Sequence, residues 1–199
     1  ELVFQLEKAI IVAIQERRPE LLFLHAAALE RDRAAWLFVG ESGAGKSTTT
    51  WGLRHHGFRY LGDELAPIDL DTVEVLPYPH ALCLKRRPPP PYLLPAEFLD
   101  LESTIHVPAR YLPSVSRLDP CALQAVFFVS QDARRRDPAL RRVSTAEAAA
   151  RLYVSTLNAL AHEARGLDAV LKVASHASCF VLQAGDLEST CKLIAATDI

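Results

Sequence analysis

The chain has 199 residues, of which 50% are hydrophobic and 23% are charged, and its formal net charge is −2. This length and composition predict one domain with a substantial core, and the balanced charge argues against nucleic acid or a membrane as a partner. The four cysteines lack metal-ligand or disulfide-scaffold spacing, and no apolar run could span a bilayer, so we expect a cytoplasmic protein with reduced thiols. The chain contains no methionine, and we expect its native start to precede residue 1.

The first elements are predicted to be a helix and a pair of strands. Residues 2–17 carry apolar side chains at helical spacing, namely Val3, Leu6, Ile10 and Ile14. Two apolar runs follow, at residues 21–29 and 34–39, and a charged turn separates them. This pattern predicts a β-hairpin whose second strand leads into a glycine-rich segment.

That segment has the pattern G-x-x-x-x-G-K-S of a phosphate-binding (Walker A) loop, and a helix predicted over residues 46–56 follows it. Its glycines allow successive backbone N–H groups to face one anion, Lys46 can reach the β- and γ-phosphates, and Ser47 can bind Mg²⁺. We therefore expect the loop to bind a nucleotide. The predicted binding residues are Gly40, Glu41, Ser42, Gly43, Ala44, Gly45, Lys46, Ser47 and Thr48.

An acidic pair, Asp63 and Glu64, follows the next predicted strand, at residues 58–61. Carboxylates at this distance from the loop can hold Mg²⁺ or accept a proton from an attacking hydroxyl, and a polar turn is the alternative. Lys85, after a predicted strand at 81–84, either supplies positive charge to a phosphoryl group or marks a solvated strand end.

The rest of the chain is predicted to alternate strands and helices. Further strands are expected at 65–70, 72–76, 123–130 and 177–183, and helices at 144–161, 166–175 and 187–196. The first of these helices opens with a capping box, Ser144 to Glu147, and the last with Asp186. Arginines between 134 and 142 are expected in a loop, where they either clamp an acidic substrate or are solvated. We divide the single domain into residues 1–20 (N-terminal helix), 21–85 (nucleotide-binding core), 86–122 (proline-rich connection) and 123–199.

The order Leu24-His25-Ala26, the glycine loop, His56-Gly57-Phe58 and Asp63-Glu64 resembles the catalytic domain of HPr kinase/phosphorylase, and most of all the smaller HPr-kinase-related proteins. The resemblance implies an α/β fold with a P-loop-containing mixed β-sheet core and flanking helices, shared with ATP-dependent phosphoenolpyruvate carboxykinases. It also implies ATP and Mg²⁺ as cofactors, a serine of a protein or peptide as acceptor, and a possible homo-oligomer.

The resemblance also implies roles for individual residues. Lys46 and Ser47 match the phosphate and metal contacts, Asp63 and Glu64 match an acidic pair that divides the metal and base roles, and His25 matches a histidine that supports the catalytic carboxylate. The family's pair is usually two aspartates, and without the resemblance His25 would equally suit a core position. Two alternatives remain open, a non-catalytic nucleotide-binding regulatory protein and a small-molecule or carboxykinase-like phosphotransferase.

Overall fold

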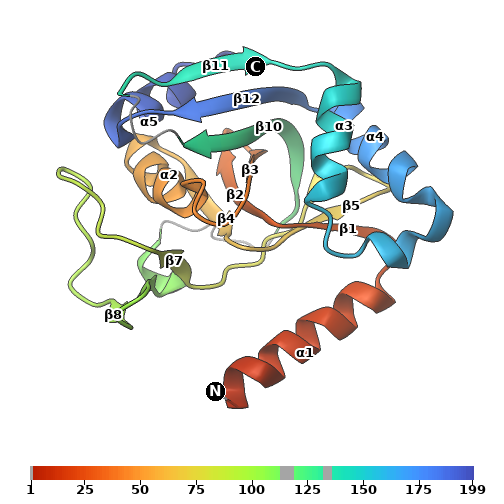
Figure 1. Cartoon of the computed structure of the whole chain (residues 1–199), viewed down its shortest axis with the longest axis horizontal. Coiled ribbons are helices and arrows are strands. Elements are labelled where there is room, and N and C mark those ends of the chain that lie inside the picture. Colours follow the sequence, from red (N-terminus) through yellow and green to blue (C-terminus); the bar gives the residue numbers. More distant parts are fainter. Residues whose placement is uncertain (1, 113–118, 132–135) are drawn as a thin grey trace.

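The structure is a computed structural model that describes residues 2–112, 119–131 and 136–199 (Figure 1). It is a mixed α/β fold in which helices flank a curled mixed sheet. The strand order is β1-β5-β6-β10-β3-β2-β4, with β12 paired to β10 and β11 paired to β12. The bounds are β1 Leu21–Leu24, β2 Ala26–Arg31, β3 Ala34–Val39, β4 Arg59–Gly62, β5 Ala66–Asp69, β6 Glu74–Val75, β10 Cys121–Gln131, β11 Ala139–Arg142 and β12 Ser178–Ala184.

The central strands are long apolar runs because both faces of the sheet are covered. β10 is parallel to both β3 and β12, so the carboxyl ends of these three strands lie at one edge. Alternate residues of β3 enter two separate cores: Leu37 and Val39 belong to one, and Trp36 and Phe38 to the other. This alternation is the two-residue period of a strand buried on both faces.

Two helices cover each face of the sheet (Figure 1). On one face, α3 (Thr145–Val154) and α4 (Gly166–His176) contribute Leu152, Val170 and Val173 to the core. On the other, α2 (Lys46–Leu53) and α5 (Leu187–Ala195) pack through Trp51 and Ile194. The helices predicted at 46–56, 166–175 and 187–196 are present, the first as α2 followed by a 3₁₀ turn, Arg54–His56, and in the cap of α5 Asp186 accepts from Ser189 N–H (2.9 Å).

A second sheet of three short strands lies beside α2. Its order is β7-β9-β8, with β7 Leu82–Leu84, β8 Leu99–Asp100 and β9 Ile105–Val107, and a 3₁₀ turn Ala109–Tyr111 follows. The proline-rich residues 86–91 connect β7 to the rest of this unit, as the sequence predicts. Leu82 and Leu84 are fully buried in the core that contains Trp51, so this sheet is held firmly against α2.

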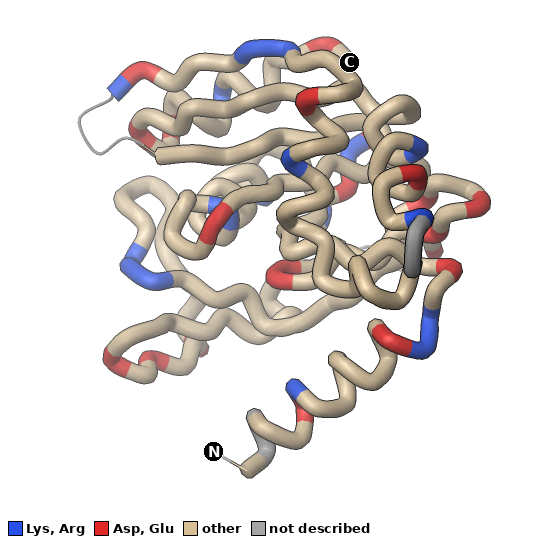
Figure 2. The backbone as a smooth tube through the Cα atoms, turned by 45° about the vertical axis from the view of Figure 1, so that its right-hand side comes forward, with Lys and Arg blue, Asp and Glu red and all other residues tan. Residues whose placement is uncertain are grey.

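The N-terminal helix α1 (Leu2–Arg17) is confirmed, but its apolar positions are not buried as an amphipathic helix would suggest. Leu6, Ile10 and Ile14 are 59%, 51% and 45% exposed. Figure 1 shows α1 at one end of the molecule, where it touches the body through Ile11 and a contact between Glu7 and His80 (2.9 Å). Charges of both signs are spread along the chain (Figure 2). Among the described residues, no helix combines the length and apolar character needed to cross a bilayer.

The run at 21–29 is not one strand, as the sequence suggested, but two. The chain bends at His25, whose N–H donates to Ser155 O (2.9 Å) instead of joining a ladder. β1 then pairs with β5, whereas β2 pairs with β3 and β4. At this bend the His25 side chain is 29% exposed, unlike the fully buried neighbours Leu24 and Ala26.

Two predictions near the third helix are also wrong. α3 ends at Val154 and not near residue 161, because the next residues leave the helix to bind β1: Leu157 N–H donates to Phe23 O (2.8 Å). A 3₁₀ segment, Ala159–Arg165, follows. Ser144 caps Glu147 N–H (3.3 Å) as predicted, but the Glu147 carboxylate pairs with Arg141 and Arg151 instead of reaching back.

Candidate functional site

The glycine loop, residues 40–45, joins the carboxyl end of β3 to the first turn of α2. Gly43 and Gly45 have φ angles of +90° and +98°, a region in which other residues are strained. A side chain at Gly40 would place its Cβ 2.5 Å from Val129 O on β10. The loop is therefore compact, and it presents the positive end of α2, where the first N–H groups have no partner within the helix.

Lys46, the first residue of α2, is buried beneath this loop with 4% of its surface exposed. Its Nζ donates to Gly40 O (2.8 Å) and Glu41 O (3.2 Å) and lies 3.1 Å from His25 Nε2. All three partners are neutral acceptors when His25 is unprotonated. Burial lowers the pKa of Lys46, while Glu64 and Asp63 act in the opposite direction through their charge.

Asp63 follows β4 and is fully buried. Its Oδ2 accepts from Cys83 N–H (3.4 Å), the Ser47 hydroxyl is a further partner, and Oδ1 has no hydrogen-bond partner. Burial raises the pKa of Asp63 to about 6, and the hydrogen bond from Ser47 limits the shift. An unsatisfied carboxylate oxygen in a buried position is costly, and a cation is one partner that would satisfy it.

Glu64 and His25 are neighbours close to Lys46. His25 Nδ1 is 3.5 Å from Glu64 Oε2, and 54% of the Glu64 side chain is exposed. Glu64 has a φ of +70°, which is unusual for a residue with a long side chain. Burial, and after it the Lys46 charge, lowers the pKa of His25, while Glu64 opposes the shift. His25 is thus only half-buried, between an ammonium group and a carboxylate, and it is not a core residue.

Strand β7 reaches this site from the second sheet. Leu82 and Leu84 face α2, so the alternate residue Cys83 lies on the opposite side of the strand, and the exposed Lys85 directly follows its end. Lys85 Nζ donates to Ser42 Oγ (3.0 Å), and it lies 3.5 Å from the position that a Cβ on Gly43 would occupy. The contact of the Cys83 N–H with Asp63 could not be found from sequence, because a backbone donor leaves no pattern.

Gln131 is a second residue that the sequence reasoning missed. It ends β10, and its Oε1 lies 3.9 Å from where a Cβ on Gly45 would stand. The sequence did contain a signal for it. A strand that pairs in parallel with the strand before the glycine loop has its carboxyl end beside that loop. The parallel pairing of β3 with β10 was not predicted, so the signal was not read.

The arginine cluster is not brought to this site in the part that the structure describes. Arg141 and Arg142 lie on the strand β11 and not in the expected loop, and Arg141 pairs with Glu147 (2.9 Å). The chain forms a strand here because Val181 and Phe180 of β12 pair with it. Arg134 and Arg135 lie outside the described residues.

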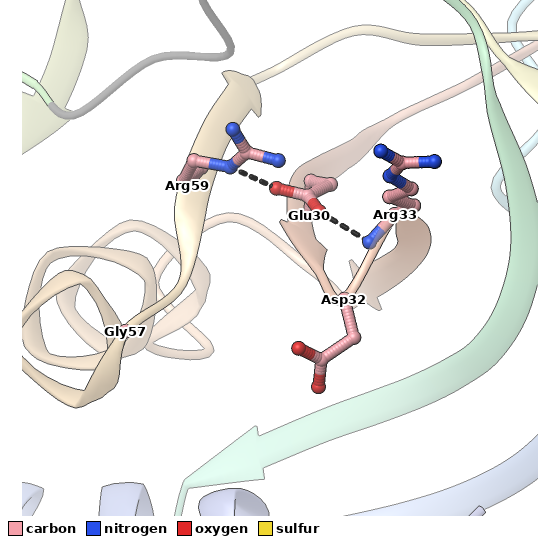
Figure 3. A pocket seen from close by; sticks show the side chains of 5 residues that line it. All are labelled: Glu30, Asp32, Arg33, Gly57 and Arg59. Carbon is pink, nitrogen blue, oxygen red and sulfur yellow. Dashed lines mark hydrogen bonds and ion pairs between the residues drawn. The ribbon is translucent and has the colours of Figure 1, made fainter.

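An open hollow at the opposite end of β3 is a separate feature (Figure 3). It is lined by Glu30, Asp32, Arg33, Gly57 and Arg59. The buried carboxylate of Glu30 accepts from the Arg59 side chain and from Arg33 N–H (2.5 Å), so its charge is already balanced. Asp32 and Arg33 both have positive φ angles, as in a tight hairpin turn. We interpret the residues that line this hollow as ones that stabilise the β2–β3 turn.

Comparison of the chain with protein-family models finds no family that matches, and comparison with curated proteins finds no relative. The function must therefore be argued from the site itself. The site joins a glycine loop at a helix start, a buried lysine, a buried carboxylate with one free oxygen, and a histidine beside an exposed carboxylate.

Proposed function

We propose that this protein is a kinase that uses Mg²⁺ and ATP to phosphorylate a hydroxyl group, with a serine of a protein or peptide as the acceptor. The observation that carries the proposal is the meeting of three groups at one place. The open glycine loop, the buried Lys46 and the unpartnered Oδ1 of Asp63 converge on Ser47, which begins the helix with Lys46. Structural stability alone does not explain a buried lysine and a buried, unsatisfied carboxylate side by side.

The phosphate groups of ATP would lie in the glycine loop. The N-terminal N–H groups of α2 and the loop backbone supply donors, and Lys46 exchanges its carbonyl partners at Gly40 and Glu41 for phosphate oxygens. Such an exchange is favourable, because hydrogen bonds between charged groups are stronger than those to neutral carbonyls. The lysine is thus held in place before the nucleotide arrives.

The residues present fit a magnesium ion. Among the described residues, no three His, Cys, Asp or Glu side chains converge in the manner of a protein-only metal site. Mg²⁺ does not need one, since it is commonly bound by one or two protein oxygens together with phosphates and water. The Ser47 hydroxyl and Asp63 would hold it, and the free Oδ1 provides the coordination site. When bound, the ion neutralises charge on the phosphates.

Glu64 suits the role of the base better than Asp63 does. It is more exposed, so an acceptor hydroxyl can approach it, and its carboxylate lies 3.5 Å from His25 Nδ1. The acceptor O–H gives its proton to Glu64, the acceptor oxygen bonds to the γ-phosphorus, and the bond from that phosphorus to the bridging oxygen breaks to release ADP. Serine as the acceptor is supported by the similarity of the motifs to HPr kinase/phosphorylase catalytic domains.

The test is to measure ATP binding and phosphoryl transfer on the same preparation. ATP binding is followed by calorimetry with and without Mg²⁺. Transfer to serine-containing peptides and to a cell extract is followed by intact-mass spectrometry, with Lys46→Ala as the inactive control. A product that carries one added phosphoryl group, and that is absent with Lys46→Ala, supports the proposal. Tight ATP binding without transfer favours a regulatory nucleotide-binding protein, and transfer to a small organic acid favours a carboxykinase-like enzyme.

A further inference from the structure

Two lysines contact the glycine loop at different places. Lys46 is buried and donates to the carbonyl oxygens of Gly40 and Glu41, whereas Lys85 is exposed and donates to the Ser42 hydroxyl. The hydroxyl is a neutral partner for a full positive charge. The neighbouring Arg87, by contrast, pairs with the carboxylate of Asp100 (3.3 Å) and lies over the ring of Phe98.

Lys85 directly follows the buried strand β7, and its own side chain is exposed. Leu82 and Leu84 are fully buried against α2, so β7 cannot slide relative to the helix that begins the loop. The same strand donates Cys83 N–H to Asp63 Oδ2 (3.4 Å). The chain thus contacts the buried carboxylate from β7 and, two residues later and just beyond the strand, the Ser42 hydroxyl of the loop. The Lys85 ammonium is therefore at the loop, two residues along the chain from the contact with Asp63.

On the basis of the proposed kinase function, we propose that Lys85 is a second phosphate-binding lysine that contacts the terminal phosphoryl group of ATP. When ATP binds, Lys85 exchanges the Ser42 hydroxyl for oxygens of the γ-phosphate, while Lys46 remains at the inner phosphates. Two ammonium groups then neutralise charge on either side of the phosphorus that is transferred. Because ADP lacks that group, Lys85 discriminates between substrate and product.

The experiment compares the affinities of ATP and ADP, with Mg²⁺, for the wild type, Lys85→Met and Arg86→Met. Methionine keeps the length of the lysine stem without its charge, and the exposed Arg86 is the adjacent control. We expect Lys85→Met to weaken ATP binding about tenfold, as suits one charge-assisted hydrogen bond, and ADP binding less than twofold. Arg86→Met should change neither affinity. Lys85→Arg should restore part of the ATP affinity and of the transfer rate.

The results of this experiment distinguish a failure of the Lys85 proposal from a failure of the kinase proposal. If the wild type binds no ATP, the kinase proposal fails and this one fails with it. If the wild type binds and transfers but Lys85→Met weakens ATP and ADP equally, or behaves as Arg86→Met does, only the role of Lys85 is overturned. Thermal unfolding of the nucleotide-free variants shows whether the second sheet remains folded. A lower transfer rate in a variant with unchanged ATP affinity and reduced thermal stability also counts against a contact with the terminal phosphate.

Discussion

The ammonium group of Lys46 lies 3.1 Å from Nε2 of His25, and this contact determines where the imidazole carries its proton. A lysine ammonium can only donate, so Nε2 must accept and the ring proton must be on Nδ1. Nδ1 faces Glu64, whose Oε2 is 3.5 Å away. Lys46, His25 and Glu64 are therefore consecutive neighbours, and the backbone of Glu64 is a further hydrogen-bond partner of His25.

We expect His25→Gln to reduce phosphoryl transfer by roughly one to two orders of magnitude while ATP binding changes little, because glutamine can still accept from Lys46 but cannot orient Glu64 in the same way. Steady-state kinetics should show the loss in kcat and not in KM for ATP. A variant that loses ATP affinity in proportion to its rate would instead place His25 in nucleotide binding.

The stability of the protein should also depend on His25 as the pH falls. Its pKa is lowered in the folded state, so the stability it contributes is present above the ordinary value near 6.5 and is lost as the pH falls through the folded value. Protonation would place a second cation against Lys46. Urea unfolding between pH 7.5 and 5 should therefore show a steeper loss of stability for the wild type than for His25→Gln. Parallel curves would contradict the depressed pKa.

Asp63→Asn should make the nucleotide-free protein more stable and inactive. The pKa of Asp63 is raised to about 6, so its contribution to stability is present below the unfolded value of 3.8 and is lost as the pH rises through 6. Removing the charge should add about 3 kcal/mol at pH 8, and the gain should shrink toward pH 4. Denaturant unfolding at the two pH values checks this.

Magnesium and ATP should reverse that order of stability. Ligand binding stabilises the folded state in proportion to the logarithm of ligand concentration over Kd. Wild type should therefore gain more from Mg²⁺-ATP than Asp63→Asn does, whereas ATP with a chelator should stabilise both to the same extent. An equal response to Mg²⁺ in the two proteins would remove Asp63 from the metal site.

Glu64 is held in a strained backbone conformation, with a φ of +70°. Glycine adopts this region without the steric cost of about 1 kcal/mol that a side chain carries there. We expect Glu64→Gly to be at least as stable as the wild type and to lose transfer, and Glu64→Gln to lose transfer without the gain in stability. Chemical denaturation and the mass-spectrometric assay measure the two properties separately. A clear loss of stability in Glu64→Gly would show that the carboxylate, and not the function, maintains this conformation.

Much of the sheet and helix pattern could be predicted because its signals are local. Gly57 with a positive φ ends the 3₁₀ turn that follows α2, and Asp186 caps α5, as their residue types indicate. The bend at His25 could not be predicted, because the apolar run continues through it. Its cause is a hydrogen bond to Ser155, far along the chain. The end of α3 depends on the same long-range pairing with β1.

In the candidate site, too, short motifs could be predicted from the sequence, whereas contacts between residues far apart in the chain could not. The loop and Asp63 could be named as candidates from sequence because each is a short pattern with a chemical requirement, and the structure brings them close together. The strand that completes the site was only partly found: Lys85 was named as a candidate, but its partner Ser42 lies 43 residues away. Only the packing of the second sheet on α2 shows that the two meet.

Gly40 and Gly57 offer a matched pair of substitutions that separates crowding from backbone strain. Alanine at Gly40 would bring its Cβ to 2.5 Å from Val129 O, so β3 and β10 would have to move apart. Alanine at Gly57 would meet nothing within 4 Å but would adopt a φ of +86°. We expect Gly57→Ala to cost about 1 kcal/mol of stability and to leave ATP binding unchanged.

Gly40→Ala should cost more, on the order of 2 kcal/mol or above, because the clash is with backbone that cannot rotate away. It should also weaken ATP binding, since Gly40 O is one of the atoms that position Lys46. Urea unfolding and calorimetry on the two variants test both statements. Equal losses of stability with ATP affinity retained in both would mean that the close approach of β10 to the loop has no part in shaping the nucleotide site.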